Sequence, residues 1–233
     1  MLGPEHPNVA LLYNSIGCVY ADLGDYTKAL EYHQKSLEIG KKVLGHEHPD
    51  VAILYNNIGD VYKRKGDYTK ALEYYQKALF IQEKVLGHEH PDVSTLYNNI
   101  GDVYHSLGDY AKALEHYQKA LEISEKVLAP KYPNVAAILN NLGQCYFNWK
   151  EFEKAKEYTE KSLELIKNTI GQYNSEYGMI LGNLALIYYE MGENKKAIEC
   201  LEKSLEIIQE ISPEAHQMII DMREKLSEIK SIK

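Results

Sequence analysis

The chain has 233 residues, 26% of them charged, and a formal net charge of −8 at pH 7. Because it is acidic and has no basic cluster, we expect no nucleic acid and no membrane surface among its partners. It has no apolar run near the roughly 18 residues that a membrane-spanning helix needs. The cysteines (Cys18, Cys145 and Cys200) are odd in number and widely spaced, which indicates reduced thiols and a cytoplasmic location.

A pattern of 42 residues recurs five times along the chain without gaps. Residues 44–85 and 86–127 differ at only nine aligned positions, and more divergent copies occupy residues 2–43, 128–169 and 170–211. A fixed period of about 20 to 50 residues predicts a solenoid, in which each unit packs on its neighbours. Because such a stack has no internal boundary, we expect a single domain over residues 1–233.

The first copy begins inside the loop that would follow a preceding helix. Its first predicted helix carries Leu11, Leu12 and Ile16, and no earlier helix covers these residues. We expect one of two explanations. The chain is a piece of a larger protein, which is the favoured explanation, or it associates end to end through this uncapped helix.

The second copy shows the helical pattern most clearly. Pro49 suits the first turn of a helix, where the N–H group that proline lacks is not needed. Apolar residues then recur every three or four positions until Gly66, which is the spacing of one helix face. Asp67 can cap a second helix, and Gly87 is suited to end it. With no strand pattern in the chain, the sequence predicts an all-α fold, a right-handed α-solenoid of five helix-turn-helix units.

Small residues recur at the points where the two helices of each unit must approach closely. One such column contains Gly17, Gly59, Gly101, Gly143 and Ala185, and another contains Ser36, Ala78, Ala120, Ser162 and Ser204. A large side chain in either column would force the helices apart. A further column holds tyrosine in every copy, which we interpret as core packing with the hydroxyl group at the rim.

The fourth and fifth copies depart from the pattern. Lys150 stands where the first three copies have a turn glycine, and Ser175 stands where the other copies have a loop proline. The helical columns survive in both, so we keep five repeats and expect these two to be less regular. After the fifth copy, Ser212 and Pro213 are a helix-start signal. The apolar stripe that follows predicts a capping helix over residues 212–233.

The helix-turn-helix unit, its small-residue columns and its tyrosines resemble the tetratricopeptide repeat, whose minimal unit is 34 residues. The longer 42-residue form, LGHEHPDVA followed by LYNNIGDVY and GDYxKALEYYQKAL, is similar to repeats of kinesin light chains and of nephrocystin-3. The resemblance covers residues 2–211. It implies that the first helix of each unit lines a concave groove that binds a peptide.

The resemblance also indicates which residues would line that groove. The first are the paired asparagines of the middle copies and the single asparagine of the fifth: Asn56, Asn57, Asn98, Asn99, Asn140, Asn141 and Asn183. Asparagine both donates and accepts hydrogen bonds, so a row of them can bind the backbone of an extended peptide. The alternative interpretation is that these residues cap helices, bind water or bond between neighbouring repeats, and both interpretations can hold at once.

Side-chain specificity would come from positions one and two turns further along the same helices. These positions hold Asp60, Lys63, Arg64, Asp102, His105, Gln144, Phe147 and Tyr189. The set is mixed in charge and lacks the several lysines and arginines that would clamp a C-terminal carboxylate. We therefore expect a basic or polar stretch of peptide near Asp60 and Asp102, and an apolar anchor near Phe147 and Tyr189.

The sequence offers no support for catalysis. It contains no phosphate-binding loop, dinucleotide fingerprint or nucleophile elbow. The histidine pairs in the loops, such as His46 with His48, invite a zinc hypothesis, but the first and fourth copies do not preserve them. We expect no metal and no cofactor, and we expect the loop histidine before each proline to hydrogen-bond between units.

The sequence thus predicts a non-catalytic scaffold that binds a partner protein through an extended peptide segment in its groove. The alternative is a structural spacer or a self-assembling repeat array within a larger multidomain protein.

Overall fold

The computed structural model describes residues 6–127, 133–211 and 216–231. These residues form eleven helices and no strand, which confirms the all-α prediction. The helices are α1 (Pro7–Asp22), α2 (Tyr26–Leu44), α3 (Pro49–Lys65), α4 (Tyr68–Leu86), α5 (Pro91–Ser106), α6 (Tyr110–Val127), α7 (Pro133–Asn148), α8 (Phe152–Thr169), α9 (Ser175–Glu190), α10 (Asn194–Ile211) and α11 (His216–Ser231). Five consecutive helix pairs therefore correspond to the five copies of the sequence pattern.

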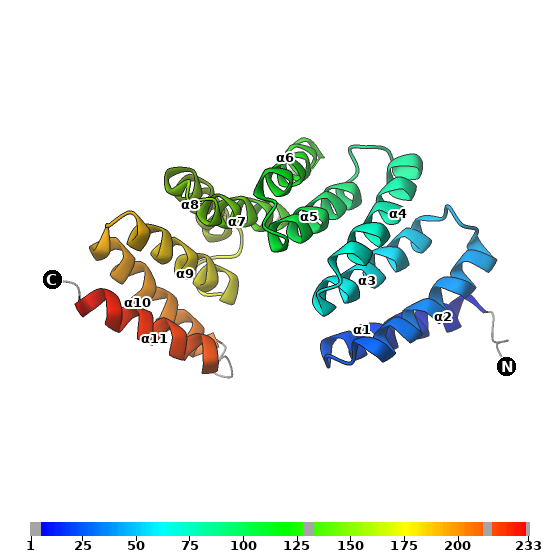
Figure 1. Ribbon diagram of the computed structural model, residues 1–233, viewed down its shortest axis with the longest axis horizontal. Helices are drawn as coiled ribbons and strands as arrows, with labels where there is room; N and C mark the ends of the chain where they lie inside the picture. Colours follow the sequence, from blue (N-terminus) through cyan, green and yellow to red (C-terminus); the bar gives the residue numbers. More distant parts are fainter. Residues whose placement is uncertain (1–5, 128–132, 212–215, 232–233) are drawn as a thin grey trace. The chain divides into compact units, whose positions relative to one another are not determined.

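The chain divides into two compact units, residues 1–123 and 124–233, and α6 spans the division. In the first unit α1 packs on α2, α2 on α3, and α3 on α4 (Figure 1). In the second unit α7 packs on α8, α8 on α9, and α9 on α10. This pairing of consecutive helices is typical of a tetratricopeptide-type solenoid. A single domain over the whole chain stays a prediction.

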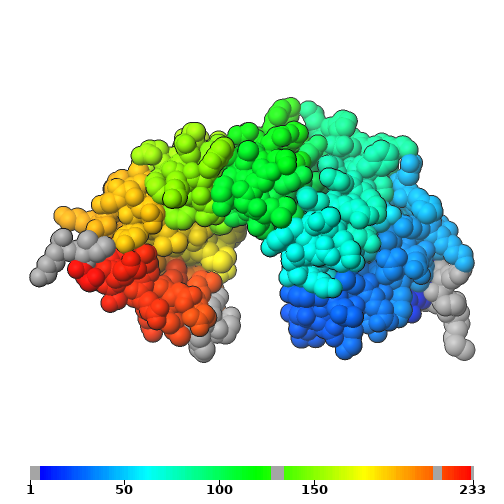
Figure 2. Space-filling view, in the orientation of Figure 1, coloured from blue at the N-terminus to red at the C-terminus, as the bar shows by residue number. Residues whose placement is uncertain are grey.

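Helix α11 packs on α10, and its surface lies against that of α10 in Figure 2, where the two are red and orange. Ile219 and Ile229 of α11 are buried, and Met222 and Leu226 pack against the adjoining core. The apolar stripe therefore faces the solenoid, as a capping helix requires. The predicted start signal at Ser212 and Pro213 lies outside the described residues.

The first three helix pairs begin with the same capping chemistry. Proline occupies the first position of α1, α3 and α5, so the first free backbone N–H belongs to the next residue. The preceding histidine accepts that N–H through its Nδ1 atom, at 3.1 Å for His6, 3.2 Å for His48 and 3.1 Å for His90. These loop histidines therefore cap the helix of their own repeat. Among the described residues these histidines bond within their own repeat, so the expected hydrogen bond between units is not observed.

The glycine column lets aromatic side chains lie directly against the first helix of each pair. A Cβ atom added to Gly59 would lie 2.7 Å from the ring of Tyr75, and one added to Gly101 would lie 2.7 Å from the ring of Tyr117. Both rings are fully buried and cannot retreat. The glycines thus allow the closest approach of the two helices, as the sequence predicts.

The serine column adds a hydrogen bond to this contact. Ser36, Ser162 and Ser204 of the second helices donate to backbone carbonyl groups of Ala10, Ala136 and Gly178 in the first helices. In the third pair the direction reverses, and Ser94 of α5 donates to the carbonyl group of Ala120. Small size and a hydroxyl group at these positions therefore fasten the two helices of a repeat together.

The turn between the helices of a pair requires a residue with positive φ. Gly66 has φ of 81° and Gly108 has φ of 76°, a region that costs glycine little. Lys150 occupies the same turn in the fourth repeat with φ of 64°, and it is the only non-glycine residue with positive φ in the described chain. The fourth repeat therefore keeps the turn geometry, but with a lysine in an unfavourable backbone conformation. This is how the repeat is irregular, as the sequence predicts.

Replacing this lysine by glycine should stabilise the protein. Lys150→Gly removes the steric penalty of a Cβ atom in the left-handed region, and we expect a gain of about 1 kcal/mol in the free energy of unfolding. The measurement is urea unfolding followed by circular dichroism. Lys161→Gly, on the exposed face of α8, is the control and should lose about 1 kcal/mol. An unchanged or lower midpoint for Lys150→Gly would show that the turn is not strained.

A histidine takes the place of the buried tyrosine in the first repeat. His33 is 1% exposed, packs against Gly17, and its Nδ1 lies 3.0 Å from Oδ1 of Asn14. Burial lowers the pKa of His33. Burial likewise lowers the pKa values of His105 and His116 in the same unit. The folded first unit therefore favours the neutral form of all three histidines.

Acidification should consequently destabilise the first unit. A histidine whose pKa is lower in the folded state contributes its full stability above its ordinary pKa of 6.5 and loses it as the pH falls through the folded value. We expect thermal unfolding at about pH 5.5 to begin earlier than at about pH 7.5. His33→Tyr, which introduces the residue type of Tyr75 and Tyr117, should show a smaller difference between the two pH values. Identical differences for both proteins would exclude His33 as a contributor.

Candidate functional site

The predicted groove asparagines form hydrogen bonds between consecutive repeats. In each observed case the second asparagine of one repeat donates from Nδ2 to Oδ1 of an asparagine in the preceding repeat. The bonds run from Asn57 to Asn14 at 3.0 Å, from Asn99 to Asn56 at 2.9 Å, and from Asn183 to Asn140 at 3.1 Å. The alternative interpretation, bonding between neighbouring repeats, is therefore observed at these three steps.

These three hydrogen bonds form an asparagine ladder. The ladder fixes the orientation of its amide groups but does not use all of their donor hydrogens. A side-chain amide has two donor hydrogens and one acceptor oxygen, and the bond between repeats uses one donor of Asn57 or Asn183. The side chains of the ladder are half-buried. The groups that remain lie on a rigid scaffold, which is the arrangement that a peptide backbone can use at low entropic cost.

The charged candidates of the first unit have hydrogen-bond partners within that unit. Asp60 accepts from the Tyr75 hydroxyl at 2.5 Å and from Nδ2 of Asn56 at 3.2 Å. Burial raises the pKa of Asp60, and the hydrogen bond from Tyr75 opposes the rise. Asp102 accepts from Nζ of Lys63 at 3.0 Å and from the Tyr117 hydroxyl at 2.9 Å. These carboxylates are therefore tied into the packing of the repeats.

Two further candidates of the first unit also have partners within it. Arg64 donates to Asp22 at 2.9 Å and to the carbonyl group of Ala21 at 3.3 Å, both in the first repeat. The half-buried ring of His105 lies 5.7 Å from the ring of Tyr110. A ligand that used Arg64 would compete with contacts that join neighbouring repeats, and one that used His105 would compete with a contact inside its own repeat.

A smaller apolar pocket in the first unit, of about 210 Å³, lies between α1, α2 and α3. It opens beside Gly40, a buried glycine in the interior of α2. The later repeats place a side chain at this position: Gln82, Ser124, Ile166 and Ile208. The first repeat therefore has no side chain at this edge of the pocket, where the later repeats have one.

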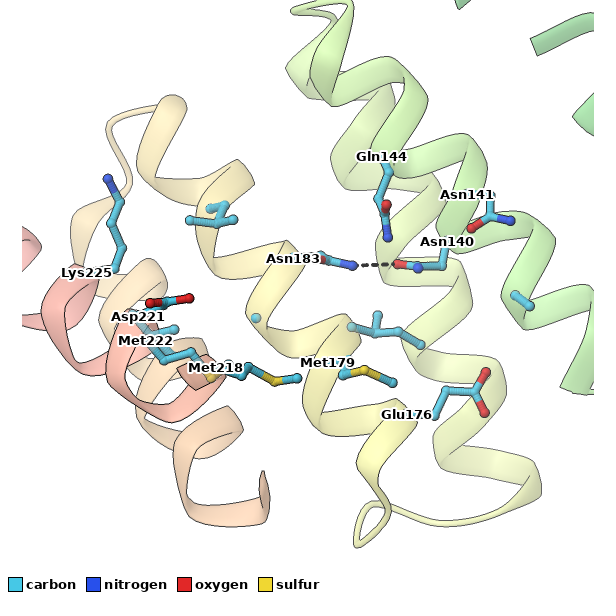
Figure 3. A pocket seen from close by; sticks show the side chains of 15 residues that line it. Asn140, Asn141, Gln144, Glu176, Met179, Asn183, Met218, Asp221, Met222 and Lys225 are labelled. Carbon is cyan, nitrogen blue, oxygen red and sulfur yellow. Dashed lines mark hydrogen bonds between the residues drawn. The ribbon is translucent and has the colours of Figure 1, made fainter. Parts of the chain in front are cut away.

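A pocket with a volume of about 950 Å³ lies in the second unit. Helices α7, α9 and α11 provide most of its lining (Figure 3), and α10 adds Leu201. Four of the predicted groove residues are among its lining side chains: Asn140, Asn141, Gln144 and Asn183. The structure therefore brings these four predicted residues to one hollow surface.

Helix α11 supplies part of this surface, which the sequence interpretation missed. Met218, Asp221, Met222 and Lys225 of α11 line the pocket. The sequence held a signal for them. Continuing the 42-residue period places Asp221, Met222 and Lys225 in the columns of Met179, Ile180 and Asn183. The predicted cap is thus in register with the first helix of a sixth repeat, and it adds one helix to the lining of the pocket.

The predicted apolar anchor residues are not among the residues that line this pocket. The ring of Phe147 lies 5.8 Å from that of Phe152. The hydroxyl of Tyr189 donates to Oε1 of Glu228 at 3.0 Å, which ties α9 to α11. Apolar lining comes instead from Met179, Leu186 and the two methionines of α11. An anchor at Phe147 and Tyr189 stays a prediction.

The described residues offer little for catalysis or metal binding. No group of three or more histidine, cysteine or acidic side chains suited to a metal ion occurs among them. Burial raises the pKa of Cys145 to about 12 and that of Cys200 to about 11, so both thiols are protonated at neutral pH. None of the helices formed by these residues is both long and apolar enough to cross a bilayer.

Solved structures of similar fold come from several sources. BtubC (BKLC) from P. vanneervenii is 25% identical, with a TM-score of 0.76 over 86% of this chain and 80% of that chain. A putative kinesin light chain from Podosopora anserina with nearly identical TPR-like repeats is 23% identical, with a TM-score of 0.73 over 88% and 97% of the two chains. The apo form of RapI is 19% identical, with a TM-score of 0.73 over 86% and 70%. The last two likenesses show the fold alone.

No curated protein is significantly similar in sequence to this chain. A family model described as tetratricopeptide repeat, however, matches overlapping stretches at residues 8–84, 50–126, 92–168 and 136–210. Together these stretches run from residue 8 to residue 210 and reach into all five copies of the pattern, and they confirm the resemblance drawn from the sequence. The chain therefore belongs to the tetratricopeptide repeat family.

Proposed function

We propose that this protein is a non-catalytic interaction scaffold that binds an extended peptide segment of a partner protein. Tetratricopeptide repeats commonly mediate protein–protein interactions. The observation that carries the proposal is the 950 Å³ pocket of the second unit, in which consecutive first helices present amide side chains on a rigid framework. In this proposal the protein is cytoplasmic, consistent with three cysteines that are all free thiols.

The amides of the pocket suit a peptide backbone better than a small substrate. Gln144 and Asn141 have amide groups that both donate and accept, which matches the alternating groups of an extended chain. A ligand held by its backbone can vary in its side chains, so the pocket would accept a class of sequences. The surrounding apolar side chains would then select among them.

Peptide display tests this proposal directly. A random peptide library selected on the immobilised protein should give binders whose affinity falls about two- to tenfold in Gln144→Ala and in Asn183→Ala, because each loses one hydrogen bond. Asn168→Ala, on the exposed surface of α8, is the matched control and should leave the affinity unchanged. Failure to select any peptide, or binders that are insensitive to both groove variants, would contradict the proposal.

A second candidate function, end-on self-association, has a specific observation in its favour. Leu12 is 59% exposed and Val19 is 58% exposed on α1. Their counterparts one repeat later, Leu54 and Val61, are 7% and 1% exposed. The counterparts in the remaining repeats are buried as well: Leu96, Ile138, Ile180, Val103, Cys145 and Ile187.

The cause is the neighbouring helix. In the second repeat α2 of the preceding pair packs on α3, and Val61 lies in one cluster with Ala29 of α2. Within the described residues, α1 has no such helix on this side. Its face therefore has the composition of a packing surface, and a second copy of this chain could cover it.

Molar mass at several concentrations tests this second function. Light scattering after size exclusion should show a mass that rises with concentration for the wild type, because two apolar faces would be buried against each other. Leu12→Glu with Val19→Glu should abolish the rise, whereas Leu107→Glu, a change at another exposed leucine, should preserve it. A monomeric mass at every concentration would exclude self-association through α1.

A further inference from the structure

The pocket of the second unit differs from the rest of the repeat surface in its methionines. Met179, Met218 and Met222 line it, which is three of the five methionines in the chain. Met179 is 44% exposed and Met218 is 37% exposed, so their thioether groups are accessible. Met218 and Met179 extend toward one another from α11 and α9 (Figure 3). Flexible, polarisable side chains of this kind adapt to apolar groups of different shapes.

This apolar site exists because the asparagine ladder ends at the fifth repeat. Gly182 occupies the column of Asn56, Asn98 and Asn140 and has no amide to accept the next bond. A Cβ atom added to Gly182 would lie 2.9 Å from the terminal methyl carbon of Met222. The methionine of α11 therefore fills the space where a ladder side chain would stand, and the polar row gives way to an apolar surface.

The charge of the pocket is negative. Glu176 and Asp221 line it, and among the described residues no cation pairs with either carboxylate. Asp221 accepts from Nε2 of Gln217 at 2.7 Å, which leaves its charge intact. Glu176 is half-buried, and burial raises its pKa. Both observations indicate carboxylates that lack a counterion.

The lysine of the pocket does not balance these charges. Nζ of Lys225 lies 3.1 Å from both carboxylate oxygens of Glu228 and 4.0 Å from the centre of the Tyr189 ring. Its side chain extends away from the methionines (Figure 3). The charge of Lys225 is therefore paired with Glu228. An acidic ligand in the pocket would meet two carboxylates and no available cation of the lining.

We propose that the pocket formed by α7, α9 and α11 binds a basic, amphipathic peptide segment. An apolar side chain of the segment packs on Met179, Met218 and Met222, lysine or arginine side chains pair with Glu176 and Asp221, and the amides of α7 bind the backbone. This inference rests on the proposed peptide-binding function and names the class of its ligand. It depends on α11 as a binding element as well as a cap.

The composition of selected peptides tests this inference. Peptides selected from a random phage-displayed library on the wild-type protein should be enriched in lysine or arginine together with leucine, isoleucine, methionine or phenylalanine. The protein is acidic overall, so cationic peptides could also bind elsewhere on its surface. Charge removal at the pocket must therefore be compared with equal charge removal outside it.

For the best selected peptide, Glu176→Gln with Asp221→Asn should weaken binding by about five- to tenfold. The control pair Glu206→Gln with Glu224→Gln removes the same charge from exposed positions outside the lining and should change affinity less than about twofold. Met179→Gln or Met218→Gln should weaken binding by about tenfold. Ile220→Gln, an exposed apolar position of α11 outside the pocket, is the control for that loss.

The outcomes separate the two proposals. Enrichment of acidic or uncharged peptides, or equal losses in the pocket and control charge variants, would overturn the basic ligand. If Gln144→Ala still weakened those peptides, peptide binding in the groove would stand. If none of the groove variants affected any selected peptide, both proposals would fail.

Discussion

The close approach of two helices within each repeat is the constraint on which the other features of this structure depend. The approach requires the backbone of Gly59 or Gly101 to meet an aromatic ring directly, because even one Cβ atom would lie 2.7 Å from that ring. The hydroxyl of Tyr75 in turn donates a hydrogen bond to Asp60, and the hydroxyl of Tyr117 donates one to Asp102. The packing of a helix pair thereby sets the position of the polar groups on its first helix.

From this fixed geometry the repeats are joined by side chains on their first helices. The asparagine ladder links α1 to α3, α3 to α5, and α7 to α9 with bonds of 2.9–3.1 Å. The same amides line the pocket of the second unit, so one row of residues both joins repeats and forms a polar surface. The ladder ends at Gly182. Beyond it, methionines of α9 and α11 line the pocket together with two carboxylates, so this part of the surface is apolar and acidic. A departure from the repeat pattern therefore creates the local character of the site.

Much of the fold could be predicted from the sequence, because periodicity, capping residues and small-residue columns are local and additive signals. The bounds of α3 and α4 at Pro49, Gly66, Asp67 and Gly87 follow directly from them. The site was only partly predictable. Asn140, Asn141, Gln144 and Asn183 line the pocket, whereas the charges of the first unit bond to neighbouring repeats, which column position alone cannot reveal. The role of α11 was missed because its residues resemble a terminal cap, although their 42-residue spacing from α9 carried the signal.

The most direct test of the account is a titration of methionine methyl groups by NMR with a peptide selected on the protein. Met179, Met218 and Met222 line the pocket, and Met191, at the end of α9, does not. The account predicts that the ε-methyl signals of the three pocket methionines shift together with one binding constant while that of Met191 stays in place. Binding that shifts none of the three, or that shifts Met191 alone, would contradict the claim that this groove is where the protein holds its partner.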